Sequence, residues 1–476
     1  MLYDAYEVQR SFLAGASKLA GLGAGWLTNP ANPLAYASTS PLIAASLEVF
    51  SHAAAPRGKP AFGIERTVVE GKEVRVREEV VLRKPFGQLK RFVREGVEDG
   101  PGLLIVAPMS GHYSTLLRGT VERMLPRHDV YVTDWRDAKL VPTSDGNFDL
   151  DDYIDYLVEF LETVGKITGG RPHMIAVCQP SVPAFAATAL MNADKNPSRP
   201  KTLTMMGGPI DTRKAPTAVN TLATQRPLSW FRQNVIATVP AIYPGSGRKV
   251  YPGFLQLAGF MAMNLGDHLV SHWEMFKHLV VGDEESADAT RAFYDEYRAV
   301  CDMTEEFYLQ TVEVVFQRHQ LPRGKLTHRG RKVDPTAITD TALLAIEGER
   351  DDISGIGQTK AALGLATKLK SSAKKYFLAP NVGHYGIFNG GKWREIIAPV
   401  VRTGSPRTVR WSPACAAYRS KCGEGRRRTP GRTGPQQPLR RSLPLNMVQA
   451  APRHFPRGQL QEAKLRAGRR HATARY

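Results

Sequence analysis

The chain has 476 residues and an apolar fraction of 42%, which is enough for one large domain with an insertion or for two domains. No apolar run reaches the length of a bilayer, and Asp4 and Glu7 lie where a signal peptide would be basic and apolar, so we expect a cytoplasmic protein without a membrane span. The 4 cysteines share no C-x-x-C spacing, which argues against a disulfide framework and a zinc site; we expect no metal and no cofactor.

The net charge of +19 is concentrated at one end of the chain. Residues 401–476 contain 18 Lys and Arg against two Glu, so the rest of the chain is nearly neutral. This segment is rich in Arg, Pro, Gly and Gln and has too few apolar residues to fold alone, which predicts a disordered basic C-terminal tail. We therefore expect nucleic-acid binding, if any, only through the 401–476 tail.

The first 65 residues predict an N-terminal helical segment. Spaced apolar positions indicate a helix over 6–22, which Asn29-Pro30 ends, and a second helix over 41–53. Both helices are Ala-rich and amphipathic. Two interpretations stay open: docking on the body of the protein, or contact with an apolar surface.

Residues 66–210 predict the first part of a core with a largely parallel sheet. Residues 73–94 alternate apolar and charged side chains around a Pro-Phe-Gly turn, which is typical of an antiparallel hairpin. Apolar strands with helices between them follow, the strands at 103–106, 130–133, 174–177 and 203–206 and the helices at 114–124, 153–164 and 184–191. This alternation indicates a doubly wound α/β sheet that binds ligands at the carboxyl ends of its strands.

Between residues 211 and 335 the alternation lapses, and aromatic residues lie among Pro and Gly. An insertion at this point predicts a lid or cap. Its residues Trp230, Phe231 and Tyr251 are candidate substrate-binding residues, because ligand pockets are lined mainly by apolar and aromatic side chains. The second part of the core is expected at 336–400, with strands at 341–346 and 376–378.

Two features of the insertion are interpreted as structural. One long helix is expected over 288–317, with Cys301 on its buried face. His268 and His272 have the spacing of zinc ligands, but Leu269 stands where the H-E-x-x-H motif has its glutamate, so no metal site is expected there.

A candidate nucleophile lies at a sharp turn in residues 171–183, RPHMIAVCQPSVP. An apolar strand ends at Cys178, Gln179-Pro180 cannot continue it, and a helix follows, which is the pattern of a nucleophile elbow. The N–H of Gln179 would then face a developing oxyanion. The usual motif is G-x-S-x-G, whereas Ala176 and Pro180 replace the glycines here. A buried core thiol is the alternative interpretation.

Nucleophile, acid and base candidates follow strands in the order of the α/β-hydrolase fold: Cys178, Asp351, His384. A free thiol has a pKa of about 8.5, so an imidazole must take its proton and a carboxylate must orient the ring. Asp351 is preferred over its neighbour Asp352 because it comes three residues after the turn residue Gly348.

The loop after the 103–106 strand holds the other candidates for the site. The backbone N–H groups of Met109 and Ser110 are candidates for the second oxyanion donor. His112 is a weaker candidate base, because it lies near a helix N-terminus, where an imidazolium is disfavoured.

Ten strings of the sequence are long or specific enough to indicate a family: MLY, TNP, APMSGHYSTLLR, VYVTDW, VCQPSVP, TMMGGPID, YPGFLQ, FYDEY, EGERDDISGIGQT and GHYGIF. They resemble the intracellular polyhydroxyalkanoate (polyhydroxybutyrate) depolymerases over roughly residues 1–400. The resemblance implies an α/β-hydrolase fold with a lid. It also implies hydrolysis of a polyester at the surface of storage granules by a Cys-Asp-His triad, here Cys178, Asp351 and His384. It does not specify the oligomeric state.

Other functions stay open at this point. A polyhydroxyalkanoate synthase or another thiol esterase of similar fold would use the same three residue types, although a synthase is expected to keep glycine where Ala176 and Pro180 stand. A non-enzymatic granule-surface protein that binds nucleic acid through its tail is a further alternative. The proteins that this chain resembles end soon after the helix near Trp393, so the 401–476 tail is a departure to which we assign no enzymatic role.

Overall fold

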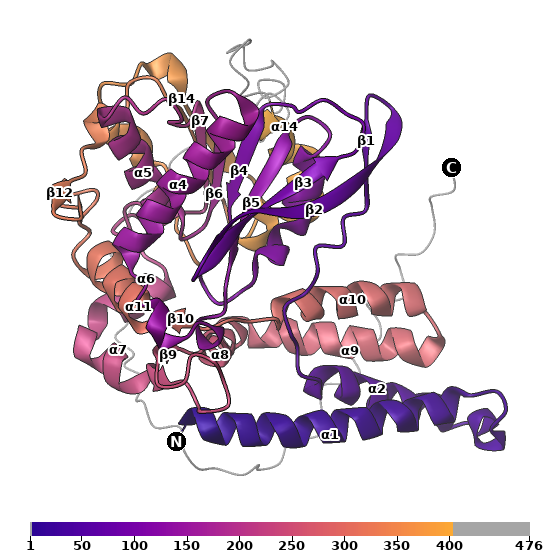
Figure 1. Cartoon of the computed structure of the whole chain (residues 1–476). Helices are drawn as coiled ribbons and strands as arrows, with labels where there is room; N and C mark the ends of the chain where they lie inside the picture. Colours follow the sequence, from indigo (N-terminus) through magenta and orange to yellow (C-terminus); the bar gives the residue numbers. More distant parts are fainter. Residues whose placement is uncertain (1, 403–476) are drawn as a thin grey trace, which may run out of the picture. The chain divides into compact units, whose positions relative to one another are not determined.

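A computed structural model describes residues 2–402, which are built around a nine-stranded sheet (Figure 1). The strand order is β1-β2-β3-β5-β4-β6-β7-β13-β14. The bounds are β1 (Arg66–Val69), β2 (Lys72–Lys84), β3 (Gly87–Arg94), β4 (Gly102–Val106), β5 (Asp129–Trp135), β6 (His173–Val177), β7 (Thr202–Met206), β13 (Ala342–Gly348) and β14 (Lys374–Ala379). The last six strands in this order run parallel, and β1, β2 and β3 pair antiparallel at one edge. The predicted hairpin and the α/β-hydrolase fold are both confirmed.

Helices cover both faces of this sheet. Every residue of β4 and β6 is buried, which explains why these strands appear in the sequence as unbroken apolar runs. The helices α4 (Leu150–Thr168) and α5 (Ser181–Ala193) lie on one face, and α14 (Ala398–Arg402) lies behind the sheet in the same view (Figure 1). Trp393, just before α14, is fully buried and donates a hydrogen bond of 3.3 Å to the Gly119 carbonyl in α3 (Arg118–Met124).

The helix that follows the Cys178 turn is buried along almost its whole length. Residues 181–192 of α5 are all buried, and many of them are Ala. Because alanine side chains are small, the helix axis can approach the sheet closely. The start of α5, and with it the turn before the helix, is therefore fixed by the packed core.

The insertion between the adjacent strands β7 and β13 is a set of helices with a small sheet β10-β9-β8. Its elements are α6 (Ala218–Gln225), α7 (Leu228–Asn234), β8 (Ala237–Thr238), β9 (Lys249–Tyr251), α8 (Gly253–Met263), α9 (Leu265–Val281), α10 (Glu284–Tyr297), β10 (Met303–Thr304), α11 (Glu305–Thr311), which continues as a π-helix over Val312–Gln317, β11 (Thr327–His328) and β12 (Arg331–Lys332). The short α12 (Ala361–Leu365) and α13 (Gly390–Lys392) belong to the second part of the core.

The prediction of a single helix over residues 288–317 is wrong. The chain leaves α10 after Tyr297 and forms β10, in which Met303 pairs with Tyr251 of β9. Cys301 lies in this break, and its N–H donates to the Gly111 carbonyl at 2.7 Å. The thiol is buried as predicted, with the residue 2% exposed, but it belongs to a connection and not to a helix face.

The N-terminal helices α1 (Leu2–Thr28) and α2 (Ser40–Ala54) pack on each other and on the insertion (Figure 1). The Tyr3 hydroxyl donates to a carboxylate oxygen of Asp302 at 2.5 Å, and the ring of Tyr6 stacks on Phe254 with centroids 3.9 Å apart. The segment therefore docks on the protein, which was the first of the two interpretations.

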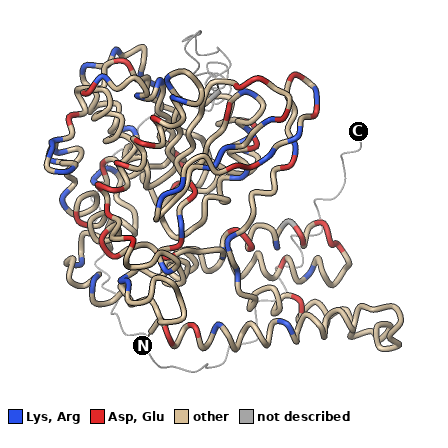
Figure 2. The backbone as a smooth tube through the Cα atoms, in the orientation of Figure 1, with Lys and Arg blue, Asp and Glu red and all other residues tan. Residues whose placement is uncertain are grey.

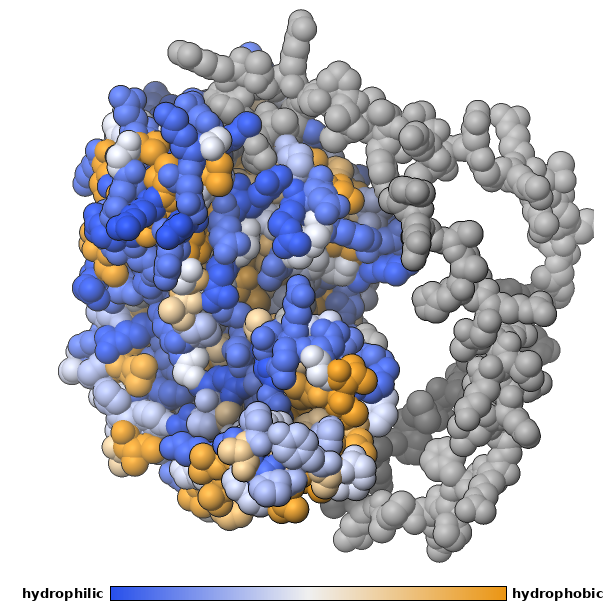
Figure 3. Space-filling model, turned by 90° about the vertical axis from the view of Figure 1, so that its right-hand side faces the viewer, coloured by the Kyte–Doolittle hydropathy of each residue, from blue (hydrophilic) through white to orange (hydrophobic). Residues whose placement is uncertain are grey.

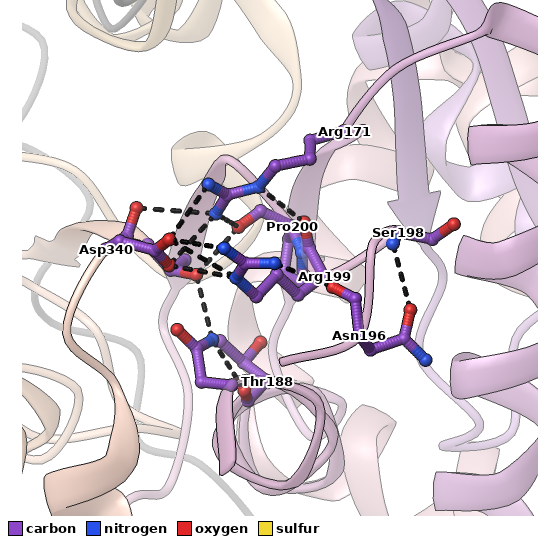
Figure 4. A network of polar contacts seen from close by, with 9 residues as sticks. Arg171, Thr188, Asn196, Ser198, Arg199, Pro200 and Asp340 are labelled. Carbon is purple, nitrogen blue, oxygen red and sulfur yellow. Dashed lines mark hydrogen bonds and ion pairs between the residues drawn. The ribbon is translucent and has the colours of Figure 1, made fainter. Parts of the chain in front are cut away.

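Ion pairs join three connections at the amino ends of the parallel strands (Figure 4). Arg171 precedes β6, Arg199 precedes β7 and Asp340 precedes β13. Both guanidinium groups bind the Asp340 carboxylate, at 3.1 Å and 2.7 Å, and Arg171 also donates to the Pro200 carbonyl at 2.9 Å. These contacts hold the ends of neighbouring strands together.

None of the helices within residues 2–402 is long and apolar enough to cross a membrane. The predicted disorder of the basic tail concerns residues 403–476, which lie outside the described residues.

Candidate active site

Cys178 lies at the apex of a sharp turn between β6 and α5. Its φ of 66° falls in the left-handed region, which a residue with a Cβ rarely adopts. Two hydrogen bonds hold this backbone: Cys178 N–H donates to the Met206 carbonyl at the end of β7 at 2.7 Å, and Ser181 N–H donates to the Cys178 carbonyl at 3.0 Å. Such strain persists only where the surrounding structure enforces it, and it is typical of functional sites.

His384 and Asp351 form a buried pair beside this turn. The ring nitrogen Nδ1 of His384 lies 2.8 Å from Oδ2 of Asp351, and the two side chains are 5% and 0% exposed. The other oxygen of Asp351 accepts hydrogen bonds from the backbone N–H groups of Ile353 and Ser354 at 2.9 and 2.8 Å. These bonds fix the carboxylate, which in turn fixes the ring.

The structure distinguishes the two adjacent acids. Asp351 contacts His384, whereas the exposed Asp352 accepts a hydrogen bond from the Asn264 amide at 3.2 Å. The sequence-based preference for Asp351 thus agrees with the geometry.

The charges around His384 favour its protonated form. Burial alone would lower the pKa of this imidazole, but Cys178 and Asp351, through their charges and their hydrogen bonds to the ring, raise the pKa well above its ordinary value of 6.5. The Cys178 side chain is thus in hydrogen-bond contact with the ring whose other nitrogen faces Asp351. An imidazolium at this position is suited to stabilise a thiolate.

Two glycines after β7 give the three side chains their space. A Cβ at Gly207, whose φ is +60°, would lie 3.1 Å from the His384 ring and 3.2 Å from the Asp351 carboxylate. A Cβ at Gly208 would overlap the Ser181 side chain and lie 3.0 Å from the Cys178 carbonyl. The backbone that follows the neighbouring strand β7 therefore approaches the Cys178 turn closely, and the two glycines of the TMMGGPID string make this possible.

The candidate oxyanion donors lie at the same place. Gln179, Met109 and Ser110 all line the cavity that Cys178 and His384 line. Within residues 2–402, their backbone N–H groups donate to no protein acceptor. These N–H groups are therefore free to bind an oxygen of a ligand.

His112 is not placed to act as a base. Its Nε2 donates to the Tyr297 carbonyl at 3.0 Å, and no carboxylate among the described residues contacts the ring. Burial lowers its pKa to about 4, so the ring is neutral at physiological pH. Its position ties the 108–112 loop to the lid.

Cys178 and His384 line a cavity of about 390 Å³ with mostly apolar walls. Phe231 and Tyr251, two of the candidate substrate-binding residues, line it. Trp230 does not: its ring packs edge-on against Phe231 with centroids 5.2 Å apart, and the residue is partly exposed. Further walls that the sequence did not single out come from residues of α6, α8 and α11 and from the end of the core, namely Leu222, Phe260, Met263, Tyr308 and Phe388.

A supporting residue that sequence reasoning missed is Glu347, which is fully buried at the end of β13. Its carboxylate accepts hydrogen bonds from the N–H groups of Gly357 and Lys360 at 2.8 and 2.9 Å and from the Tyr376 hydroxyl at 2.7 Å. It therefore organises the loop that carries Asp351. An acid inside the apolar run ALLAIEG was the available signal.

The described residues include no group of three or more His, Cys, Asp or Glu that could hold a metal ion. The pair His268 and His272 is used in helix packing instead: Nδ1 of His268 lies 3.0 Å from the Tyr294 hydroxyl, and Nδ1 of His272 lies 2.8 Å from the His268 carbonyl.

The sheet order, the strained turn and the residues at three strand ends define an α/β hydrolase with a lid. A family model described as the PHB de-polymerase C-terminus matches residues 207–406 of this chain. The family that the sequence resembles is thereby confirmed. The protein is an ester-bond hydrolase.

Solved structures similar to this chain include three hydrolases. An esterase from Thermogutta terrifontis is 14% identical over 71% of this chain and 95% of its own, with a TM-score of 0.35. A 2-hydroxy-6-oxo-6-phenylhexa-2,4-dienoate hydrolase from Rhodococcus sp. strain RHA1 is 11% identical over 66% and 94%, with a TM-score of 0.38. A monoacylglycerol lipase from Paleococcus ferrophilus is 11% identical over 64% and 94%, with a TM-score of 0.38. No curated protein sequence matches the chain.

Proposed function

We propose that the protein hydrolyses poly-3-hydroxyalkanoate, with polyhydroxybutyrate as the reference polymer, and mobilises polyester stored in cytoplasmic granules. One observation carries this proposal: a cysteine at a strained turn contacts a histidine that is bound to a buried acid, and the cysteine and histidine line an apolar cavity. The family match over residues 207–406 supplies the substrate class.

Each of the three residues has one role. Cys178 is the nucleophile, because its side chain stands out of the turn toward the cavity and contacts His384. His384 carries the proton. Asp351 holds the ring in one orientation and stabilises its positive charge.

In the first step the thiolate of Cys178 attacks the carbonyl carbon of an ester bond. The carbonyl oxygen becomes an oxyanion, which the N–H of Gln179 and the N–H of Met109 or Ser110 stabilise. As the tetrahedral intermediate collapses, the C–O bond breaks and the imidazolium of His384 gives its proton to the leaving oxygen. The hydroxyl-terminated product leaves, and a 3-hydroxyacyl thioester stays on Cys178.

In the second step the now neutral His384 takes a proton from water. The resulting hydroxide attacks the thioester carbonyl, the C–S bond breaks, and a 3-hydroxy acid is released. The thiolate and the imidazolium are both restored. Water is the proposed acceptor because the step then needs no other reactant.

The cavity suits an uncharged polymer strand. Its walls are largely apolar, and Phe231 and Tyr251 present aromatic rings to it. A polyester of this class carries no charge, so it loses little solvation when it enters such a cavity. The lid elements α6, α8 and α11 supply most of these walls.

The test is product analysis with amorphous polyhydroxybutyrate particles. We expect mass spectrometry to find soluble 3-hydroxy acids and short oligomers after incubation with the protein, and none after incubation with Cys178→Ala. Equal release by the variant, or none by either protein, would contradict the proposal. Supplying hydroxyacyl-CoA distinguishes a depolymerase from a synthase, since only a synthase would make insoluble polymer from this compound.

A further inference from the structure

The helix α1 turns small residues inward and several large apolar residues outward along most of its length. Ser17, Ala20 and Ala24 are buried, and Ser17 and Ser51 of α2 exchange hydrogen bonds between side-chain hydroxyl and backbone carbonyl at 2.8 and 2.9 Å. Five large apolar residues of this helix are 55–76% exposed: Val8, Phe12, Leu19, Leu22 and Trp26. We call these five residues the α1 stripe.

The α1 stripe lies on one side of the helix. Its members are separated by four, seven, three and four residues, and at 100° per residue they fall within an arc of about 80°. The buried Ala20 and Ala24 fall on the opposite side. This pattern is the reverse of an ordinary surface helix, which buries its large apolar residues in the protein.

The apolar surface continues beyond α1. The turn and α2 expose Leu34, Tyr36, Leu42, Ile43 and Phe50, and α9, against which α2 packs, exposes Leu265, Leu269 and Trp273 at intervals of four residues. Apolar side chains gather over the lower part of the molecule, where these helices lie (Figure 3). Single exposed apolar residues are ordinary, but a contiguous set marks an interaction surface.

The part of this surface formed by α1 and α2 carries few charges. No charged residue occurs from Leu19 to Leu47, and the charges of α1, Asp4, Glu7, Arg10 and Lys18, are balanced (Figure 2). Helices that bind anionic lipid surfaces carry many Lys and Arg on their polar face. The lack of such residues matches an uncharged apolar partner and not an anionic membrane or a nucleic acid.

The surface is also connected to the active-site cavity. Phe260 and Met263 of α8 line the cavity, and only Asn264 separates α8 from α9. A solid that contacts α1, α2 and α9 would therefore lie against a helix, α9, that follows the cavity wall directly in the chain.

We propose that the α1 stripe and the adjoining apolar residues of α2 and α9 bind solid polyester directly. The chain would be held on the particle by these helices while a single polymer strand enters the cavity. This inference rests on the proposed function, since that function names the polyester. Binding and cleavage are separate properties of separate surfaces, so each can be tested without the other.

The test compares two double variants in a Cys178→Ala background, which cannot consume the particles. Phe12→Gln with Leu22→Gln removes two stripe residues, and Val68→Gln with Ile167→Gln makes the same change at exposed apolar residues outside the stripe. Glutamine keeps α1 helical because it is a good helix former. Circular dichroism and thermal unfolding check that each variant is folded.

We expect co-sedimentation with amorphous polyhydroxybutyrate particles to weaken at least about tenfold in the stripe variant, because two large apolar side chains no longer leave water on binding. Retention of the control variant should equal that of the parent protein. Retention should also be insensitive to salt, because no ion pairs form. Equal retention of both variants would overturn the proposal.

Two other binding partners of the α1 stripe, a second copy of the chain or a lipid surface, would also overturn the proposal. If a second copy of the chain covers the stripe, static light scattering would show a dimer for the parent protein and a monomer for the stripe variant. Stripe-dependent binding to phosphatidylglycerol vesicles at least as strong as to polyester would identify a lipid surface.

The same variants with Cys178 intact distinguish this proposal from the proposed function. If particles are not cleaved by the intact protein but retention still depends on the stripe, the enzymatic proposal fails and the docking surface stands. If the stripe variant keeps both retention and cleavage, docking fails and the enzymatic proposal stands. Hydrolysis of a soluble 3-hydroxybutyrate dimer, which needs only the cavity, controls for damage to the site.

Discussion

An aspartate is paired with basic side chains at each end of the parallel strands, but one group is exposed and the other is buried. At the amino ends, Asp340 is 42% exposed and shared by Arg171 and Arg199. At the carboxyl ends, Asp351 and His384 are 0% and 5% exposed and lie beside an apolar cavity. The hydrogen-bonded Arg199 lowers the pKa of Asp340, a change that leaves its charge unaltered at neutral pH. The surroundings of His384 raise its pKa well above 6.5, which changes its charge at neutral pH.

The comparison shows that burial distinguishes an ion pair that only joins loops from one that is suited to catalysis. An exposed pair is screened by water and contributes little to stability. A buried pair is costly to desolvate, and it persists here together with a backbone strained at Cys178. Strain and buried charge at one end of a sheet therefore mark the end that does chemistry.

Replacing Cys178 or His384 with Ala should abolish turnover. Because nucleophile and base act as a unit, each single change should lower kcat by about 10⁶, and the double variant should be no slower than either single one. The measurement is the rate of 3-hydroxy acid release from amorphous polyhydroxybutyrate. Losses that multiply in the double variant would show that the two side chains act independently.

Asp351→Asn should lower kcat by about 10⁴, whereas Asp352→Asn should leave it within a few fold, because only Asp351 contacts the ring. The carboxylate of Asp351 helps to raise the pKa of His384, so removing its charge lowers that pKa. The imidazolium then loses its proton at a lower pH, and the alkaline limb of the kcat/KM profile should move to lower pH. A pH profile on a soluble ester measures this shift. An unmoved limb would contradict the assigned role of Asp351.

Gly208→Ala should destabilise the protein by about 2 kcal/mol, because the added methyl group would overlap Ser181 and force the elbow or β7 to move. Gly170→Ala is the matched control: that position also lies next to a central strand, but an added Cβ meets nothing within 4 Å. The free energy of unfolding from urea titration measures both changes. Equal values for the two variants would mean that the elbow accommodates a methyl group.

Much of the fold and the site could be predicted from the sequence. Strands buried on both faces appear as apolar runs, so β4, β6, β7 and β13 could be located. The residues after β6, β13 and β14 gave the order Cys178, Asp351, His384. These features are local to one strand and its following turn, which is why a single chain reveals them.

What failed depends on distant contacts. The 288–317 segment breaks because β10 pairs with β9, some fifty residues earlier, and helical periodicity carries no record of that pairing. Phe231 faces the cavity and Trp230 does not, since adjacent residues on a helix point about 100° apart and only tertiary packing decides which points inward. The same limit applies to α1, because the spacing of its stripe residues would be the same whether they faced the core or the solvent.

At the amino ends of the strands, Asp340→Asn should have the smallest effect, a loss of about 0.5–1 kcal/mol in the free energy of unfolding, with unchanged activity. The pKa of Asp340 is lower in the folded protein than its ordinary value of 3.8, chiefly through its hydrogen bond from Arg199. Its contribution to stability is therefore fully present above that ordinary value and is lost as the pH falls through the folded pKa. The difference between parent and variant should stay constant from about pH 5 to 8, shrink below about pH 4 and weaken in high salt. Urea titrations at several pH values measure it, and a large loss of activity in this variant would break the contrast between the two ends of the sheet.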